Sequence, residues 1–199
     1  SATADFNGSE SFIVSVTDGT ETDSQSIIVT VNAVNDAPVA TAGLSGTTNE
    51  DQSTVVTLSG SDVDGDNLTF TVGSASNGTL EISGSLVTYT PDANYNGLDS
   101  FAFTVSDGSE SSTESVTLTV SAVNDAPVLA TVSDVSFDED GSGSTSLSGS
   151  DVDGDDLVYS ITGGSDIIAT LSGTDVSFSA PANYNGSETF TVSVSDGEL

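Results

Sequence analysis

The side chains that could do chemistry in this sequence are almost all carboxylates. Of 199 residues, 31 are Asp or Glu, and Lys, Arg, His, Cys, Met and Trp are absent. This composition excludes thiolate and imidazole nucleophiles, Schiff-base lysines and Ser-His-Asp triads. No side-chain cation can pair with the acids, so each carboxylate must face water, accept backbone N–H groups or bind a metal ion from solution.

One spacing of these acids favours a metal. Asp62, Asp64 and Asp66 alternate around Gly65 between two predicted strands, so several oxygens can converge on one loop. Ca²⁺ takes six to eight oxygen ligands from carboxylates, carbonyls and water. The spacing therefore predicts a calcium-binding loop, and a solvated turn is the alternative. An EF-hand is excluded, because its sixth and twelfth positions would be Gly and Glu, and the sequence has neither there.

The uniform negative charge also limits the partners. Nucleic acids and anionic lipids are bound largely through Lys and Arg, of which there are none. No apolar run approaches the roughly 20 residues that a membrane-spanning helix needs, and no basic, then apolar, leader is present. We expect a soluble segment with any export signal outside it.

The chain repeats itself with a period of 89 residues. The organisation we predict is the C-terminal part of a preceding module at 1–36, a complete module at 37–125, and a following module at 126–199 that lacks its last strand. The repeated landmarks are Asn35-Asp36-Ala37-Pro38-Val39 with Asn124-Asp125-Ala126-Pro127-Val128, Asp62-Val63-Asp64-Gly65-Asp66 with Asp151-Val152-Asp153-Gly154-Asp155, and Asp18-Gly19 with Asp107-Gly108 and Asp196-Gly197.

Apolar residues in the complete module recur with a period of two, as in half-buried strands, and Gly, Asn, Asp and Pro punctuate them. About seven strands in some 90 residues predict an all-β fold of tandem antiparallel Greek-key β-sandwiches, arranged end to end. Tyr95 and Tyr184 precede a Phe-rich strand, where they could form a tyrosine corner. Because Phe6 stands at that position in the first copy, we interpret the position mainly as core.

These residues resemble the cadherin-like repeats of large secreted or surface-anchored bacterial adhesins of the VCBS and RTX type. The shared features are an early Glu, an Asp-x-Asp-x-Gly loop, an acid before the penultimate strand, an Asp-Gly after it, and an Asn-Asp-x-Pro linker. All five occur here in that order. The resemblance covers the whole chain and implies calcium ions at the junctions between modules.

Carried over to this sequence, the resemblance implies three ligand sets. We expect one or two ions per junction, because the linker is one residue shorter than in animal cadherins and Ala33 stands where an Asp is usual. Asp51, Asp66, Asp140 and Asp155 are expected to be solvated or outside the ligand set. The first set is Glu10, Asn35, Asp36, Asp62, Asp64 and Asp107; the second is Glu50, Asp99, Asn124, Asp125, Asp151, Asp153 and Asp196; and Glu139 with Glu188 is half of a third.

The resulting hypothesis is a calcium-rigidified extender region of a large extracellular bacterial adhesin, whose partners are calcium ions and neighbouring repeats. Three alternatives stay open. The segment could bind glycans, although it lacks Trp. It could form an extracellular filament through head-to-tail calcium joints or strand exchange, with residues 26–31 as a donated strand, although we expect truncation of a longer polypeptide rather than strand exchange to explain the incomplete terminal modules. An enzyme is least expected, because the acids recur every 89 residues as a structural unit would.

Overall fold

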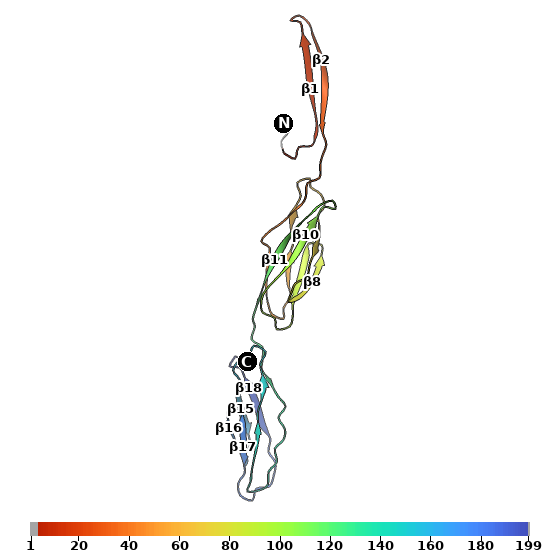
Figure 1. Cartoon of the computed structure of the whole chain (residues 1–199). Helices are drawn as coiled ribbons and strands as arrows, with labels where there is room; N and C mark the ends of the chain where they lie inside the picture. Colours follow the sequence, from red (N-terminus) through yellow and green to blue (C-terminus); the bar gives the residue numbers. More distant parts are fainter. Residues whose placement is uncertain (1–3, 199) are drawn as a thin grey trace. The chain divides into compact units, whose positions relative to one another are not determined.

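The computed structural model describes residues 4–198, which form β-strands and connecting loops with no helix (Figure 1). The predicted all-β fold is thus confirmed. The first three residues of the predicted module 1–36, and the last residue of 126–199, lie outside the described part. The chain divides into two compact units, one ending at Ala122 and one beginning at Val123. Each unit is described by itself.

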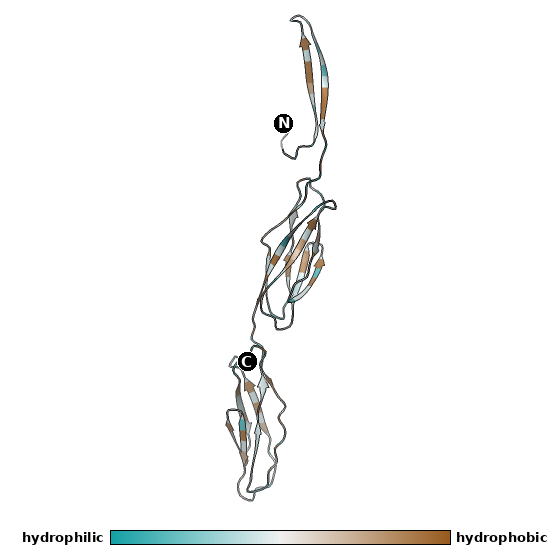
Figure 2. Cartoon of the chain, in the orientation of Figure 1, coloured by the Kyte–Doolittle hydropathy of each residue, from teal (hydrophilic) through white to brown (hydrophobic). Residues whose placement is uncertain are grey.

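Unit 1 begins with a two-stranded hairpin. Strands β1 (Gly8–Thr17) and β2 (Thr22–Val31) pair antiparallel, and Asp18 closes the turn by accepting the backbone N–H groups of Thr20 and Glu21. These hydrogen bonds lower the pKa of the Asp18 carboxyl to about 2. Every residue of both strands is exposed, although Figure 2 shows hydrophobic residues along both of them. The hairpin therefore has no core of its own.

The rest of unit 1 is a β-sandwich. One sheet has the strand order β4-β11-β10-β7, a second has β5-β9-β8, and β3 pairs with β6 (Figure 1). The strands are β3 (Val39–Ala40), β4 (Ser45–Asn49), β5 (Thr54–Thr57), β6 (Gly60–Ser61), β7 (Thr69–Val72), β8 (Gly78–Ser83), β9 (Leu86–Pro91), β10 (Gly97–Ser106) and β11 (Ser111–Ser121).

The core of the sandwich lies between the two larger sheets. Alternate residues of β10 and β11 face alternate residues of β5 and β9, and the opposite faces carry mainly polar residues, with exposed apolar exceptions such as Leu98 and Val55. This is the period-two pattern on which the fold prediction rested. The buried apolar side chains are Ala40, Val56, Leu58, Val87, Tyr89, Phe101, Phe103, Val105, Val116, Leu118 and Val120.

One pairing differs from the predicted antiparallel arrangement, because β4 pairs with β11 in parallel. The first strand of the module, β3, and its last strand, β11, both begin at the same end of the sandwich. Asn35, just before β3, hydrogen-bonds to Asp107, just before β11. Since β4 continues in the direction of β3 after moving to the other sheet, it runs alongside β11 in the same sense.

Tyr95 combines the two roles that the sequence left open. Its ring packs against the core, and its hydroxyl donates a hydrogen bond of 2.7 Å to the carbonyl oxygen of Leu98. The hydroxyl therefore pins the start of β10, as a tyrosine corner does.

Unit 2 repeats much of this sandwich over residues 123–198. Pairings β12-β14, β13-β17-β16 and β15-β18 correspond to β3-β6, β5-β9-β8 and β7-β10. Among its described residues no strand corresponds to β4 or β11. The strands are β12 (Val128–Leu129), β13 (Ser142–Ser146), β14 (Gly149–Ser150), β15 (Val158–Gly163), β16 (Ile168–Ser172), β17 (Asp175–Ser179) and β18 (Phe190–Ser195).

Candidate metal centres

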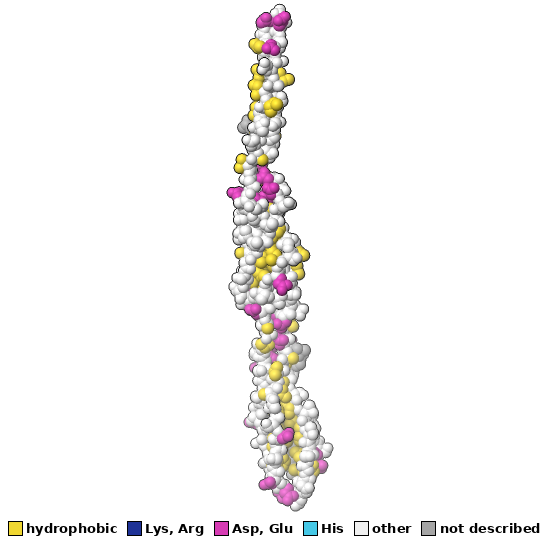
Figure 3. All heavy atoms as spheres, turned by 90° about the vertical axis from the view of Figure 1, so that its right-hand side faces the viewer, with side chains coloured by type: hydrophobic (Ala, Val, Ile, Leu, Met, Phe, Trp, Pro, Cys, Tyr) yellow, Lys and Arg dark blue, Asp and Glu magenta, His cyan; other side chains and the backbone are white. Residues whose placement is uncertain are grey.

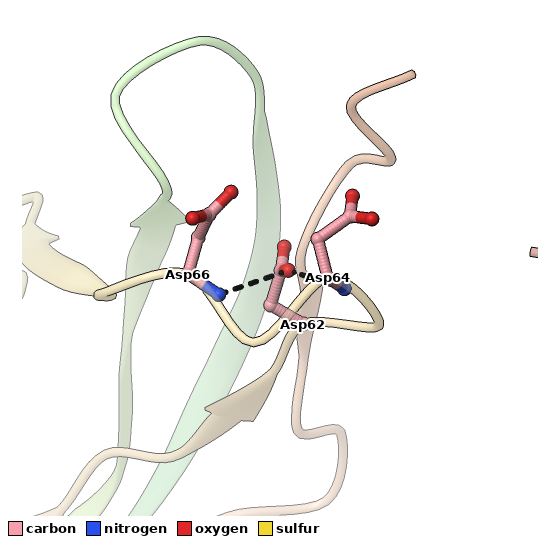
Figure 4. Close-up of side chains that lie close together, drawn as sticks. All are labelled: Asp62, Asp64 and Asp66. Atoms are coloured by element: carbon pink, nitrogen blue, oxygen red, sulfur yellow. Dashed lines mark hydrogen bonds between the residues drawn. The ribbon is translucent and has the colours of Figure 1, made fainter. Parts of the chain in front are cut away.

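The acidic loop of unit 1 follows β6 and is organised by Asp62. Its Oδ1 accepts the backbone N–H of Asp64 at 2.9 Å and that of Asp66 at 3.3 Å (Figure 4). Such Asx-type bonds are what short Asp side chains make at turns. Gly65 has φ of 80°, in the left-handed region that glycine enters without steric cost. The loop is therefore encoded locally by an Asp at its start and a Gly at its tip.

This geometry brings three carboxylates together. Asp62, Asp64 and Asp66 each place one oxygen within 4.8 Å of the other two, and Figure 4 shows the three side chains rising from the same side of the loop. Asp66, which the sequence left outside the ligand set, is therefore part of the cluster. Like charges this close repel each other unless a cation lies among them.

One carboxylate oxygen of Asp62 lies in an unusual environment. Its Oδ2 is buried and has no hydrogen-bond partner, although Oδ1 of the same carboxylate is used by the loop. A buried carboxylate oxygen without a partner is costly in a protein and requires an explanation. A bound cation would supply one.

The linker before the sandwich is attached to this loop. The backbone N–H of Asp36 donates to Asp64 at 2.8 Å, and the Asn35 amide donates to Asp107 at 2.9 Å. Asp107 also accepts the N–H groups of Glu110 and Ser109. The N–H of Glu110, the Asn35 amide and the N–H of Ser109 together hold the pKa of the Asp107 carboxyl below its usual value. Asp107 is therefore ionised wherever the sandwich is folded at neutral pH.

Unit 2 reproduces the arrangement independently. Asp151 accepts the N–H groups of Asp153, Gly154 and Asp155 on Oδ1, while its Oδ2 is buried without a hydrogen-bond partner. The carboxylates of Asp151, Asp153 and Asp155 again lie within 4.8 Å of one another. The linker bonds recur as well, from Asp125 N–H to Asp153 at 2.8 Å and from the Asn124 amide to Asp196 at 2.7 Å.

The structure thus groups part of each predicted ligand set. Linker, acidic loop and Asp-Gly turn come together within each unit, as Asn35, Asp36, Asp62, Asp64 and Asp107 do in unit 1. The acids predicted to come from a preceding module lie in other surroundings. Glu10 is exposed on β1, Glu50 is buried after β4, and Glu139 is exposed before β13.

Asp99 has a role that the sequence did not reveal. It is only 8% exposed, and it accepts hydrogen bonds from the N–H groups of Ser76, Asn77 and Ser100 and from the Tyr89 hydroxyl. Burial raises the pKa of the Asp99 carboxyl, but these bonds outweigh burial and the net effect is a lowered pKa. Asp99 is an anchor for the loop before β8.

Glu188 is the counterpart of Asp99 in unit 2 and does the same with a longer side chain. It accepts the N–H groups of Ser165, Asp166 and Ile167 at 2.8 to 3.0 Å. The bonds from Asp166 and Ser165 are the main cause of a lowered pKa of the Glu188 carboxyl. Loop anchoring therefore accounts for an acid at this position of the two sandwich modules without a metal. Only the recurrence of an acid at this position hinted at a common role.

Asp51 and Asp140 are loop anchors as well. Asp51 accepts the N–H of Asn94, and Asp140 accepts that of Asn183. All four residues have φ between 56° and 64°, a conformation that Asn and Asp tolerate better than other non-glycine residues. These two acids are hydrogen-bonded within their own units.

The residues present fit a hard divalent cation. Each centre offers several carboxylate oxygens and an Asn side chain, the oxygen-rich ligand set that Ca²⁺ and Mg²⁺ prefer. Each also contains a buried, unpartnered carboxylate oxygen, on Asp62 or Asp151. The chain has no Lys, Arg or His that could neutralise these groups instead.

The fold and the paired acidic loops define a chain of tandem immunoglobulin-like sandwich modules. The chain belongs to the family described as Bacterial Ig domain, whose model matches residues 35–121 and 124–199. No curated protein matches the chain.

Solved structures give a second comparison. Repeats EC1-2 of human protocadherin-24 are similar at 18% identity and a TM-score of 0.52, over 81% of this chain and 94% of that one. Domains 1-4 of protocadherin gamma B7 are similar at 15% identity and a TM-score of 0.49, over 94% of this chain and 56% of that one. An endo-fucoidan hydrolase of glycoside hydrolase family 107 is similar at 19% identity and a TM-score of 0.38, over 95% of this chain and 34% of that one.

These likenesses concern the fold alone. The present chain spans about a third of the length of the hydrolase and just over half of the protocadherin gamma B7 fragment. Among the described residues, no helix is long and apolar enough to cross a membrane.

Proposed function

We propose that this chain is a calcium-rigidified extender region of a large extracellular bacterial protein, an adhesin of the VCBS or RTX type. The observation that supports this most is the duplicated centre. In both units an acidic loop with a buried, unpartnered carboxylate oxygen holds the linker that enters the module. A binding centre at the entry of each module suits a joint better than a reaction site.

Calcium would act on the linker itself. In each module the linker Asn and Asp already contact the Asp-Gly turn and the acidic loop through hydrogen bonds. An ion bound by Asp62 and Asp64 would neutralise the Asp64 carboxylate, which accepts the backbone N–H of Asp36. The ion would thereby fix the path of the linker into β3. Without the ion, mutual repulsion among these groups favours an open, mobile linker.

The proposed ligands form two groups. The inner group belongs to one module and comprises the linker Asn and Asp, the acidic loop and the Asp of the Asp-Gly turn. The outer group, predicted from the resemblance, comes from the preceding module and comprises Glu10 for the first junction and Glu50 with Asp99 for the second. Glu139 and Glu188 would serve a following junction. Because Asp99 and Glu188 already anchor loops, we expect their removal to affect folding before metal affinity.

The expected calcium affinity and cellular location follow from the proposed calcium binding. Extracellular calcium modules commonly have dissociation constants of about 10⁻⁴ to 10⁻³ M, and such sites are filled where calcium is millimolar. A cytoplasmic protein would not meet that concentration. We therefore place the chain outside the cell, as a spacer that holds a binding region away from the surface. No catalytic role is proposed, because the clustered acids occur once per module.

Small-angle scattering tests the extender role. In millimolar calcium the 199-residue chain should have a well-defined maximum dimension, and in EDTA the distribution of dimensions should broaden through bending near Asn35 and Asn124. The variant Asp62→Asn with Asp151→Asn should scatter in calcium as the parent does in EDTA. Identical profiles of the parent in the two conditions would refute rigidification.

A further inference from the structure

Asp-Gly is the dipeptide in which a protein backbone isomerises most readily without an enzyme. The backbone nitrogen of Gly attacks the carboxyl carbon of the neutral Asp side chain. A C–N bond forms, and the carboxyl OH leaves as water with the amide proton. A second water molecule then opens the cyclic imide at either carbonyl, which yields Asp or isoaspartate. Glycine favours this reaction because it has no Cβ to obstruct the attack. The sequence contains six such pairs, which begin at Asp18, Asp64, Asp107, Asp140, Asp153 and Asp196.

In the turns that follow β10 and β1, a hydroxyl holds the attacking nitrogen. After β10, the N–H of Gly108 donates to the hydroxyl oxygen of Ser106 at 3.0 Å, and this hydroxyl donates to the Glu110 carbonyl at 2.9 Å. Thr17 makes the same two bonds in the turn after β1. The residue before Asp thus bridges the turn and keeps the glycine N–H engaged in a hydrogen bond.

Asp64-Gly65 differs from the other five pairs. The N–H of Gly65 has no hydrogen-bond partner among the described residues. In the three remaining pairs the glycine N–H is held, from Gly197 to the Ser195 hydroxyl at 3.0 Å, from Gly154 to the Asp151 carboxylate at 3.1 Å, and from Gly141 to the Asp138 carbonyl at 3.0 Å. Asp64 is therefore the Asp whose neighbouring nitrogen is available for attack.

The attacked carboxyl group is also held less firmly in Asp64 than in Asp107. The two oxygens of Asp107 accept two backbone N–H groups of its own turn and the Asn35 amide. These bonds, above all the one from the Glu110 N–H, lower the pKa of the Asp107 carboxyl and make the reactive neutral form rarer. The Asp64 carboxylate accepts one hydrogen bond in the described structure, from the Asp36 N–H at 2.8 Å.

Steric access does not distinguish these two pairs. Gly65 and Gly108 are both exposed, with φ of 80° and 100°, and no heavy atom lies within 4 Å of the place that a Cβ would take at either. Figure 3 shows acidic side chains at the surface of the molecule. Water, which opens the imide, therefore reaches both turns. The hydrogen bonds are the difference that decides which Asp reacts.

We propose that spontaneous isomerisation of this chain is directed to Asp64, and that the hydroxyls of Ser106 and Thr17 protect the Asp-Gly turns beside them. Isoaspartate takes the side-chain methylene into the backbone, which displaces the carboxylate. At Asp64 this breaks the bond to the Asp36 N–H and loosens the linker that enters the sandwich. The reaction involves no metal, so the proposal is independent of the proposed calcium function.

Peptide mapping of the full chain tests the proposal. The chain is incubated in EDTA at neutral pH, well below its melting transition. Isoaspartate is recognised by an unchanged peptide mass, a shifted retention time and resistance to endoproteinase Asp-N. It should accumulate at Asp64 at least about tenfold faster than at Asp107, because more than one hydrogen bond must break before Asp107 reacts. Equal rates at the two residues would overturn the proposal.

Substitution of Ser106 tests the protecting hydroxyl. Ser106→Ala removes the acceptor of the Gly108 N–H and should accelerate isomerisation of Asp107 about tenfold. Ser106→Thr supplies the hydroxyl that Thr17 provides in the other turn and should keep the parent rate. Asp64 in the same sample is the internal control, because its rate should not change. An unchanged Asp107 rate in Ser106→Ala, or an equal acceleration at Asp64 through general unfolding, would overturn the role of Ser106.

Discussion

Within the described residues, the two sandwich modules share a sequence pattern but differ in how far their core side chains are covered. In unit 1, β11 covers the core, and Phe101 and Val105 are buried. In unit 2 their counterparts Phe190 and Val194 are half-buried. The candidate metal centres hardly differ, since the bond from the linker Asp to the acidic loop is 2.8 Å in both. The burial of Phe101 and Val105 therefore goes with their place beside β11, whereas the loops of the metal centre take the same form in both units.

The largest effect should come from one residue type truncated in the two contexts. Phe101→Ala should cost about 4 kcal/mol of unfolding free energy, as usual for a fully buried Phe. Phe190→Ala should cost less than half of that, because the ring is already in contact with water. Calorimetric unfolding of both variants measures the difference. Equal losses would mean that the Phe190 ring is as well covered in solution as that of Phe101.

The second-largest loss of unfolding free energy should come from replacing Asp99. Asp99→Ala leaves the N–H groups of Ser76 and Asn77 without their acceptor and the Tyr89 hydroxyl with only the Asn77 carbonyl, and buried donors without an acceptor cost about 1 to 3 kcal/mol each. We expect a loss on the order of 3 kcal/mol, and a smaller one for Glu188→Ala, whose site is more exposed. Chemical denaturation in EDTA separates this role from metal binding. A variant that is destabilised only in calcium would make Asp99 a ligand instead of an anchor.

The pH dependence follows from the same carboxylate. Its pKa is lowered in the folded state, so the stabilisation is fully present above the unfolded value near 4 and is lost as the pH falls through the folded value. In EDTA, the unfolding free energy of unit 1 should fall below about pH 4, and Asp99→Asn should flatten this decline. An unchanged slope in the variant would assign the acid sensitivity to other carboxylates, such as Asp107.

Calcium should stabilise both modules by similar amounts, despite their different cores. Millimolar calcium is about ten times a dissociation constant of 10⁻⁴ M, and a site at that concentration adds about 1.4 kcal/mol to the folded state. Millimolar calcium should therefore raise both melting transitions above their positions in EDTA, with Mg²⁺ less effective because it demands a tighter octahedral shell. If only one transition moved, the likeness of the two centres would be superficial.

The smallest effect should come from the tyrosine corner. Tyr95→Phe keeps the ring against the core and removes only the bond to the Leu98 carbonyl, which is worth about 1 kcal/mol. Phe6 at this position of the first copy suggests that the fold tolerates the loss. Thermal unfolding in calcium measures it, and a loss above about 3 kcal/mol would mean that the hydroxyl organises the whole corner.

Much of this architecture could be predicted from the sequence because its signals are local. Alternation of apolar residues identified strands such as β10, and the spacing around Gly65 identified the acidic loop. The role of Asp99 could not be predicted, because the loop that it anchors lies more than 20 residues earlier. The burial of Glu50 and the exposure of Glu139 could not be predicted from the sequence either. Both occupy the same position in the repeat, but Glu50 follows β4, which pairs with β11, whereas the residues before Glu139 form no strand.

The central claim is that each acidic loop is a calcium site, and isothermal titration calorimetry tests it most directly. The parent chain should bind calcium at two independent centres, and Asp62→Asn and Asp151→Asn should each abolish one of them. Glu81→Gln, which removes the same charge from an exposed position on β8, should leave both intact. Unchanged calcium binding in both Asp variants would contradict the account.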